Sequence, residues 1–93
     1  MKREIIQTSK FKKDLKLAIK RGHNIDLLDE IVALLVKGEP LPEKNRDHDL
    51  KGNYKGFREC HITPDWLLVY KITEDKLVVV LTRTGSHADL FNM

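Results

Sequence analysis

The chain has 93 residues, of which 41% are hydrophobic and 33% charged, and its net charge at neutral pH is +3. This length predicts a single domain spanning residues 1–93, and the composition is typical of a globular protein rather than a disordered one. No apolar run approaches the roughly 18 to 20 residues that cross a bilayer, and the sequence does not open with a signal peptide. We therefore expect a cytoplasmic protein with no membrane partner.

The basic charge is unevenly distributed along the chain. Residues 1–24 carry eight Lys or Arg and two acidic residues, and residues 44–60 are also net basic. This pattern, with a pI near 9.1, favours a polyanionic partner such as RNA, although surface lysines on helices also serve only to solvate a face. A lone cysteine, Cys60, forms no internal disulfide and fits a reducing cytoplasm. We expect it to be a plain strand residue rather than a nucleophile.

Two helices are predicted in the first half of the chain, after a short opening strand at residues 4–7. In the first helix, apolar side chains recur at helical spacing over residues 11–19, and Gly22 ends it. The second has a broader apolar face over residues 27–35 and stops at Gly38. Because the connection between them is short, the two helices should be antiparallel.

Three strands are predicted in the second half, at residues 57–62, 66–72 and 77–83, joined by turns at 63–65 and 73–76. Connections this short make antiparallel hairpins. Residues 38–54 form a long polar loop, which in a small domain is typical of a functional segment, and residues 87–93 should form one helical turn. The predicted fold is α+β, in the order β-α-α-β-β-β, with two N-terminal helices packed on a four-stranded, mainly antiparallel sheet.

Three of the four histidines are predicted to lie near one another. His48 is in the long loop, His61 ends the first hairpin strand, and His87 follows the last strand, so all three can meet on one open face of the sheet. Imidazole transfers protons near neutral pH because its reference pKa is about 6.5. RNA cleavage needs a base that removes the ribose 2′-OH proton and an acid that protonates the departing 5′-oxygen. His23, at the turn between the helices, is expected to be inert.

Other side chains are candidates for supporting roles. Asp65 can hold an imidazole tautomer or transfer a proton itself, or it can serve only the turn in which it lies. Cations are needed to stabilise the charge on the pentavalent phosphate. The candidates are Lys51, Lys55, Arg58 and Arg83. The two arginines have an alternative role as ion-pair partners of Glu59 or Asp65.

Two aromatic side chains offer flat faces on which an RNA base can stack, Trp66 and Phe91. Each is equally suited to a place in the core. A metal site is the alternative use of three histidines and an aspartate, but the sequence contains no His-x-His, no HExxH and no paired cysteines. We therefore predict chemistry that uses no metal and no cofactor.

Three sequence motifs resemble the YafQ-like branch of RelE-type toxins. They are H-D-L-K-G at residues 48–52, H-I-T-P-D-W at 61–66 and T-G-S-H-A-D-L-F at 84–91. Together with the basic first helix, the match spans nearly the whole chain. Asp49 is a small departure, because the family motif is often less charged at this place.

The resemblance implies a RelE-like microbial RNase fold, ribosome-dependent cleavage of messenger RNA in the decoding site, and inhibition by a cognate antitoxin. The functional residues carried over by motif position are His48, His61, Asp65, His87 and Phe91, with Arg83 and Trp66 as supports. His87 is favoured as one proton-transfer group, and the motif leaves open which histidine is the base. The basic first helix, with Lys44, Arg46 and Lys51, would contact the phosphates of 16S ribosomal RNA.

Three functions are therefore compared. The leading hypothesis is an endoribonuclease toxin that inhibits translation by cutting messenger RNA with histidine and aspartate as acid and base. The second is a non-cleaving RNA- or antitoxin-binding module of the same fold, and the third is a protein-interaction domain with incidental histidines. The presence of all three motif histidines favours the enzyme.

Overall fold

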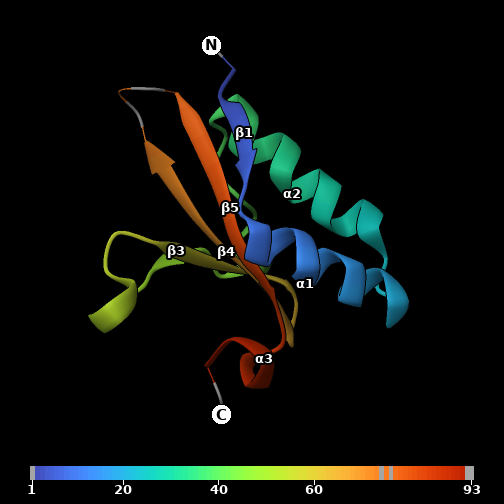
Figure 1. Ribbon diagram of the computed structural model, residues 1–93. Coiled ribbons are helices and arrows are strands. Elements are labelled where there is room, and N and C mark those ends of the chain that lie inside the picture. The colour runs from blue at the N-terminus through green and yellow to red at the C-terminus, as the bar shows by residue number, and fades with distance from the viewer. Residues whose placement is uncertain (1, 74, 76, 92–93) are drawn as a thin grey trace.

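The chain forms a mixed sheet with two helices on one side, as the α+β prediction requires. The computed structural model describes residues 2–73, 75 and 77–91. Figure 1 shows α1 and α2 side by side against the sheet and α3 at the end of β5. The elements are β1 Glu4–Gln7, α1 Ser9–Lys20, α2 Ile25–Lys37, η1 Glu43–Asn45, β2 His48–Asp49, η2 Gly52–Tyr54, β3 Arg58–Thr63, β4 Trp66–Thr73, β5 Val78–Gly85 and α3 His87–Phe91.

The two long helices begin and end where their capping residues place them. The Thr8 hydroxyl accepts a hydrogen bond from the backbone N–H of Phe11 at 3.0 Å and caps α1. The side chain of Asn24 does the same for α2. Gly22 and Gly38 follow the two helices with φ of +82° and +76°, a left-handed conformation that glycine adopts without a steric penalty. These boundaries agree with the sequence-based prediction.

Over the described residues, the sheet contains five strands in the order β1-β5-β4-β3-β2. β1 is parallel to β5, and every other neighbouring pair is antiparallel. The prediction of four strands therefore missed one, which is β2 inside the long loop. This strand has only two residues, His48 opposite Glu59 and Asp49 opposite Arg58. A segment this short has no alternation that a sequence pattern can reveal.

The two faces of the sheet have different coverings. The face against α1 and α2 forms the larger apolar core together with these helices. Its buried residues include Phe11, Leu28, Ile31 and Leu35 from the helices and Trp66, Leu68, Tyr70 and Leu81 from the strands. On the opposite face, a smaller cluster consists of Leu67, Val69 and Leu90, with Leu50, Phe57 and Phe91 packed against it. Burial of β4 on both faces follows from its nearly continuous apolar sequence. Much of the second face is therefore available to polar side chains.

A β-bulge in β5 changes which face its side chains reach. Val69 pairs with Arg83 and the next residue of β4, Tyr70, pairs with Leu81, so Thr82 is the extra residue. The carbonyl of Thr82 accepts a hydrogen bond from the Thr8 hydroxyl at 2.7 Å. Simple alternation would put Leu81 and Arg83 on the same face. With the bulge, Leu81 shares the helix-covered face with Tyr70, and Arg83 shares the opposite face with Val69.

Parts of two predicted segments lie outside the described residues. They are Glu74 and Lys76 of the turn at 73–76, and Asn92 and Met93 of the C-terminal helical turn. The described part of that turn, His87–Phe91, is helical as predicted. None of the helices in the described ranges is both long and apolar enough to cross a membrane.

Candidate functional site

Three histidines from separate elements meet on the sheet face opposite α1 and α2. The ring centroids of His48 and His61 are 6.3 Å apart, and those of His61 and His87 are 5.7 Å apart. Strand register explains the meeting, because His48 lies opposite Glu59 and His61 lies opposite Leu67. The predicted gathering of His48, His61 and His87 is therefore confirmed. We call these three residues and Glu59 the histidine cluster.

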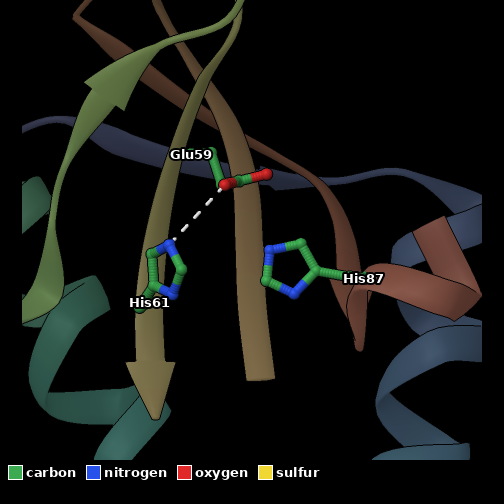
Figure 2. Close-up of side chains that lie close together, drawn as sticks. All are labelled: Glu59, His61 and His87. Atoms are coloured by element: carbon green, nitrogen blue, oxygen red, sulfur yellow. Dashed lines mark ion pairs between the residues drawn. The ribbon is translucent and has the colours of Figure 1, made fainter. Parts of the chain in front are cut away.

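Glu59 lies at the centre of this cluster and was not among the predicted site residues. Its side chain is only 6% exposed, and Oε1 lies 3.4 Å from Nε2 of His48 and 3.8 Å from Nε2 of His61. Figure 2 shows the Glu59 carboxylate near the rings of both His61 and His87. The available signal was the spacing of Glu59 and His61, because side chains two residues apart in a strand point to the same face.

The tautomers of His48 and His61 are set by backbone carbonyl groups. Nδ1 of His48 lies 2.6 Å from the carbonyl oxygen of Arg46, and Nδ1 of His61 lies 3.3 Å from that of Pro64. A carbonyl oxygen only accepts hydrogen bonds, so Nδ1 carries the hydrogen in each ring. Each Nε2 is then the nitrogen that faces Glu59 and can exchange a proton.

His87 is oriented by a carboxylate instead. Nδ1 of His87 lies 3.0 Å from Oδ1 of Asp65, and the backbone N–H of His87 donates to the same oxygen at 3.3 Å. These two hydrogen bonds, the first being the larger cause, lower the pKa of Asp65 below its ordinary value. Asp65, which is exposed, therefore contacts the predicted catalytic histidine directly, and Nε2 of His87 is left free of this contact.

The cluster has ligand atoms in a compact arrangement. One carboxylate oxygen of Glu59 and one ring nitrogen each of His61 and His87 all lie within 4.8 Å of one another. Two imidazoles and a carboxylate are ligands that zinc, copper and similar metals accept. These three residues form no metal-binding motif in the sequence, because they come from β3 and from α3.

Phe91 lies beside the cluster in a small aromatic group. Its ring meets Tyr54 edge to face at a centroid distance of 5.4 Å, and Tyr54 meets Phe57 at 6.4 Å. Phe91 is half-buried against the apolar cluster of Leu67, Val69 and Leu90. It thus borders the sheet face that carries the histidines, and its predicted contact with RNA stays a prediction.

Trp66 does not have the accessibility that its predicted role requires. Its side chain is 1% exposed and packs in the helix-covered core. The ring of His23 stacks on it at a centroid distance of 4.4 Å. Trp66 begins β4 with its side chain on the face opposite to Leu67, so it points away from the histidine cluster. The predicted base-stacking role of Trp66 is therefore wrong, and His23 covers this core residue.

Both predicted cationic arginines are held by carboxylates. Arg58 donates to Asp49 at 2.6 Å and to the two oxygens of Asp47 at 3.0 and 3.3 Å, and its pKa is raised chiefly by the hydrogen bond to Asp47. Arg83 donates to both oxygens of Asp14, which raises its pKa. The ion pairs expected as the alternative role are present, with partners other than Glu59 and Asp65. Every side-chain nitrogen of Arg58 contacts a protein acceptor, which favours the ion-pair role, and its predicted contact with RNA stays a prediction.

The two predicted lysines lie on a neighbouring surface. Lys51 and Lys55 are exposed and line a hollow of about 420 Å³ next to β2. Within the described part of the chain, neither has a carboxylate within ion-pair distance. Their predicted role in RNA binding stays a prediction. Cys60 is fully buried, and burial raises the pKa of its thiol to about 12, which fits the expected structural role.

The fold is that of the RelE-like toxins, and comparison with known proteins assigns the family. The profile of the family described as the YafQ bacterial toxin of type II toxin-antitoxin systems matches residues 3–92. The chain belongs to this family. It is 44% identical to the mRNA interferase toxin YafQ of Escherichia coli K12 over 92 residues, which cover 98% of each chain.

Two solved structures extend the comparison. One is the E. coli DinJ-YafQ toxin-antitoxin complex, to which the chain is similar with a TM-score of 0.89 and 40% identity, covering 98% of this chain and 99% of that one. The other is a metal-bound toxin from Helicobacter pylori, with a TM-score of 0.91 and 46% identity, covering 98% and 100%. These similarities are high enough to support the family assignment and the fold together.

Proposed function

We propose that this chain is the toxin of a type II toxin-antitoxin system and inhibits translation by cutting messenger RNA on the ribosome. The observation that carries the proposal is the cluster of three imidazoles around the buried carboxylate of Glu59. A relative named as an mRNA interferase that covers 98% of the chain supports the same reaction class. Because ribosomes translate messenger RNA in the cytoplasm, we propose that the protein acts there.

The proposed reaction is attack of a ribose 2′-oxygen on the adjacent phosphorus. A base removes the 2′-OH proton, the new O–P bond forms as the 5′-oxygen departs, and an acid protonates that oxygen. The products are a 2′,3′-cyclic phosphate and a 5′-hydroxyl. His87 is the preferred proton-transfer group, because Asp65 engages its Nδ1 and leaves Nε2 for the substrate. His48 and His61 share the remaining proton-transfer and charge-stabilising roles.

The proposed partner that controls this activity is a cognate antitoxin. The E. coli relative has been solved in a complex with its antitoxin DinJ. We further propose that the reaction needs no metal, because the imidazoles of the histidine cluster can supply both an acid and a base. Glu59, His61 and His87 could instead hold a metal ion, so metal independence has to be tested directly.

The test is to add purified protein to a translating reaction and to map new messenger RNA ends. We expect cuts with wild type and a loss of roughly 10²- to 10⁴-fold in His87→Ala and His61→Ala, the range for removal of an acid or base. His23→Gln is the matched control, since His23 lies outside the cluster. Cutting that persists in both cluster variants would contradict the assigned chemistry. Binding without cutting by wild type would favour the non-cleaving module.

Two further experiments test ribosome dependence and metal independence separately. Removal of ribosomes should stop or strongly slow cutting of the same messenger RNA. Dialysis of the purified protein against a chelator, before it is added to the reaction, should leave the rate of cutting unchanged. A loss of cutting that Zn²⁺ or Cu²⁺ restores would overturn metal independence.

A further inference from the structure

A second hollow lies beside the histidine cluster and is bordered by η1, the first turn of α2 and the turn between β3 and β4. Its volume is about 590 Å³, within the range of roughly 300 to 1,000 Å³ that is usual for small-ligand sites. His61 is among its lining residues, so the hollow borders one member of the cluster. The other residues used below are Leu27, Lys44, Asn45, Arg46, Ile62 and Pro64. We call this space the η1 hollow.

The cations of the η1 hollow differ from the other basic side chains near the site. Lys44 and Arg46 are exposed, and within the described ranges of the chain neither has a carboxylate within 4.0 Å. Arg58 and Arg83, by contrast, are each bound to aspartate. Leu27, Ile62 and Pro64 give the hollow an apolar wall. Two cations that have no carboxylate partner among the described residues, beside an apolar wall, suit a ligand that has both a phosphate and a flat apolar ring.

Hydrogen bonds connect the η1 hollow to the backbone of His61 and to the ring of His48. The side-chain amide of Asn45, itself buried, donates to the carbonyl oxygen of His61 at 2.7 Å. The next residue, Arg46, has φ of +46°, and its carbonyl oxygen lies 2.6 Å from Nδ1 of His48. Such a left-handed conformation is uncommon for arginine. The segment that carries Lys44 and Arg46 is therefore fixed to two of the three histidines.

We propose that the η1 hollow is a subsite for one nucleotide of single-stranded RNA next to the cleaved bond, an inference that rests on the proposed function. Lys44 and Arg46 contact a phosphate of that nucleotide, and the apolar wall packs against its base or ribose. The position of the hollow beside His61 favours RNA over an acidic protein segment, because a strand with its scissile phosphate at the cluster would have its next nucleotide within reach of this space. The subsite makes the nucleotide beside the cut part of what the enzyme recognises.

The test uses oligoribonucleotides whose sequence comes from a cleavage site mapped on messenger RNA. The cleaved nucleotide carries a 2′-deoxy substitution so that the ligand stays intact. Binding to the purified protein is measured by NMR titration for a dinucleotide that spans the cut and for two trinucleotides, each extended by one nucleotide on one side. Variants are Lys44→Gln/Arg46→Gln and, as the matched control, Lys37→Gln, about 15 Å along α2 from Leu27.

We expect one of the two extensions to increase the affinity of wild type about tenfold, and the double variant to lose only this increase. The slope of log affinity against log salt should fall by about 0.7 for each cation that contacts a phosphate. Lys37→Gln should behave as wild type, and circular dichroism should show that all variants are folded.

Three results would overturn the subsite. The double variant could bind both trinucleotides as wild type does, or it could lose affinity for the dinucleotide equally, which is a long-range charge effect. A hexaglutamate peptide could bind wild type as well as the trinucleotide and lose that binding in the double variant, which would indicate a protein partner instead. If wild type cuts messenger RNA while any of these holds, the proposed function stands and only the subsite is rejected. If wild type cuts nothing, the proposed function fails first.

Discussion

Asp65 fixes one ring of the histidine cluster. It accepts hydrogen bonds from both Nδ1 and the backbone N–H of His87, and these bonds lower its pKa. A carboxylate with a lowered pKa is ionised at neutral pH and holds Nδ1 as a donor throughout that range. The ring of His87 therefore presents Nε2 to a substrate in a defined tautomer.

We expect Asp65→Ala to lower kcat by about 10- to 100-fold with little change in KM, because the ring loses its orienting partner. Asp65→Asn should recover most of this loss, since an amide oxygen still accepts from Nδ1. The ring ¹⁵N shifts of His87 report the tautomer and should change in the alanine variant only. An asparagine variant as inactive as the alanine variant would instead make Asp65 itself a proton-transfer group.

Arg58 connects β2 to β3 on either side of His48. Its guanidinium binds Asp47, which precedes His48, and Asp49, which follows it. Asp47 also accepts a hydrogen bond from the hydroxyl of Tyr70 in β4. These contacts hold the two-residue strand and its histidine against the sheet, so the element acts as a positioning device for His48.

The two carboxylates of this arrangement should differ in importance. Asp47→Asn should destabilise the protein by about 2 kcal/mol, because the negative charge is lost and one of the two oxygens that accept from Arg58 becomes an amide nitrogen, which cannot accept. Asp49→Asn should cost less than about 1 kcal/mol, since Asp49 is 79% exposed. Urea unfolding measures both values, and cleavage should fall in the same order. If Arg58→Ala changes only the salt dependence of RNA binding and leaves unfolding unaltered, Arg58 contacts RNA and does not position His48.

At the scale of elements, the sequence predicts what periodicity and capping residues control. The boundaries of α1 and α2 follow from Gly22 and Gly38, and the β3-β4 hairpin follows from its Pro-Asp turn. Periodicity could not find β2, which is held by a long-range pairing with β3. It also could not find the bulge at Thr82, which moves Arg83 to the face away from Leu81 and whose extra residue accepts a long-range hydrogen bond from the Thr8 hydroxyl.

At the scale of the whole molecule, the first and last helices are tied together. Arg21, at the end of α1, donates to Asp89 of α3 at 2.7 Å. Asp89 also accepts from the backbone N–H of Ser86, while the Ser86 hydroxyl accepts from the backbone N–H of Asp89. This reciprocal pair is a capping box, and it fixes the start of the helix that carries His87.

The ion pair between Arg21 and Asp89 makes the stability of the protein depend on pH. The hydrogen bond from Arg21, followed by that from Ser86, lowers the pKa of Asp89 from 3.8 to about 2. A lowered folded-state pKa stabilises the protein above pH 3.8, and this contribution is lost as the pH falls toward 2. Asp89→Asn should therefore be less stable at pH 7 and lose less stability than wild type between pH 4 and 2. Parallel urea-unfolding profiles of the two proteins over that interval would contradict this role.

The sequence could predict only those residues of the candidate site whose side-chain type is suited to the proposed chemistry. Proton-transfer chemistry singles out His48, His61, Asp65 and His87, and the structure brings all four together. Glu59 could not be predicted in this way, because a glutamate in a strand is ordinarily a surface residue. Its burial depends on the pairing of β2 with β3 in the folded protein. Trp66 was misassigned for a similar reason, since its burial depends on which sheet face the helices cover.

The central claim is that imidazoles activate a ribose 2′-OH against the neighbouring phosphorus. The most direct test replaces the 2′-OH by hydrogen at one mapped cleavage position in a ribosome-bound messenger RNA. The account predicts that cutting at that position stops, and that unsubstituted RNA yields ends with a 2′,3′-cyclic phosphate and a 5′-hydroxyl. Continued cutting at the deoxy position, with 5′-phosphate ends, would mean that water attacks the phosphorus and would contradict the account.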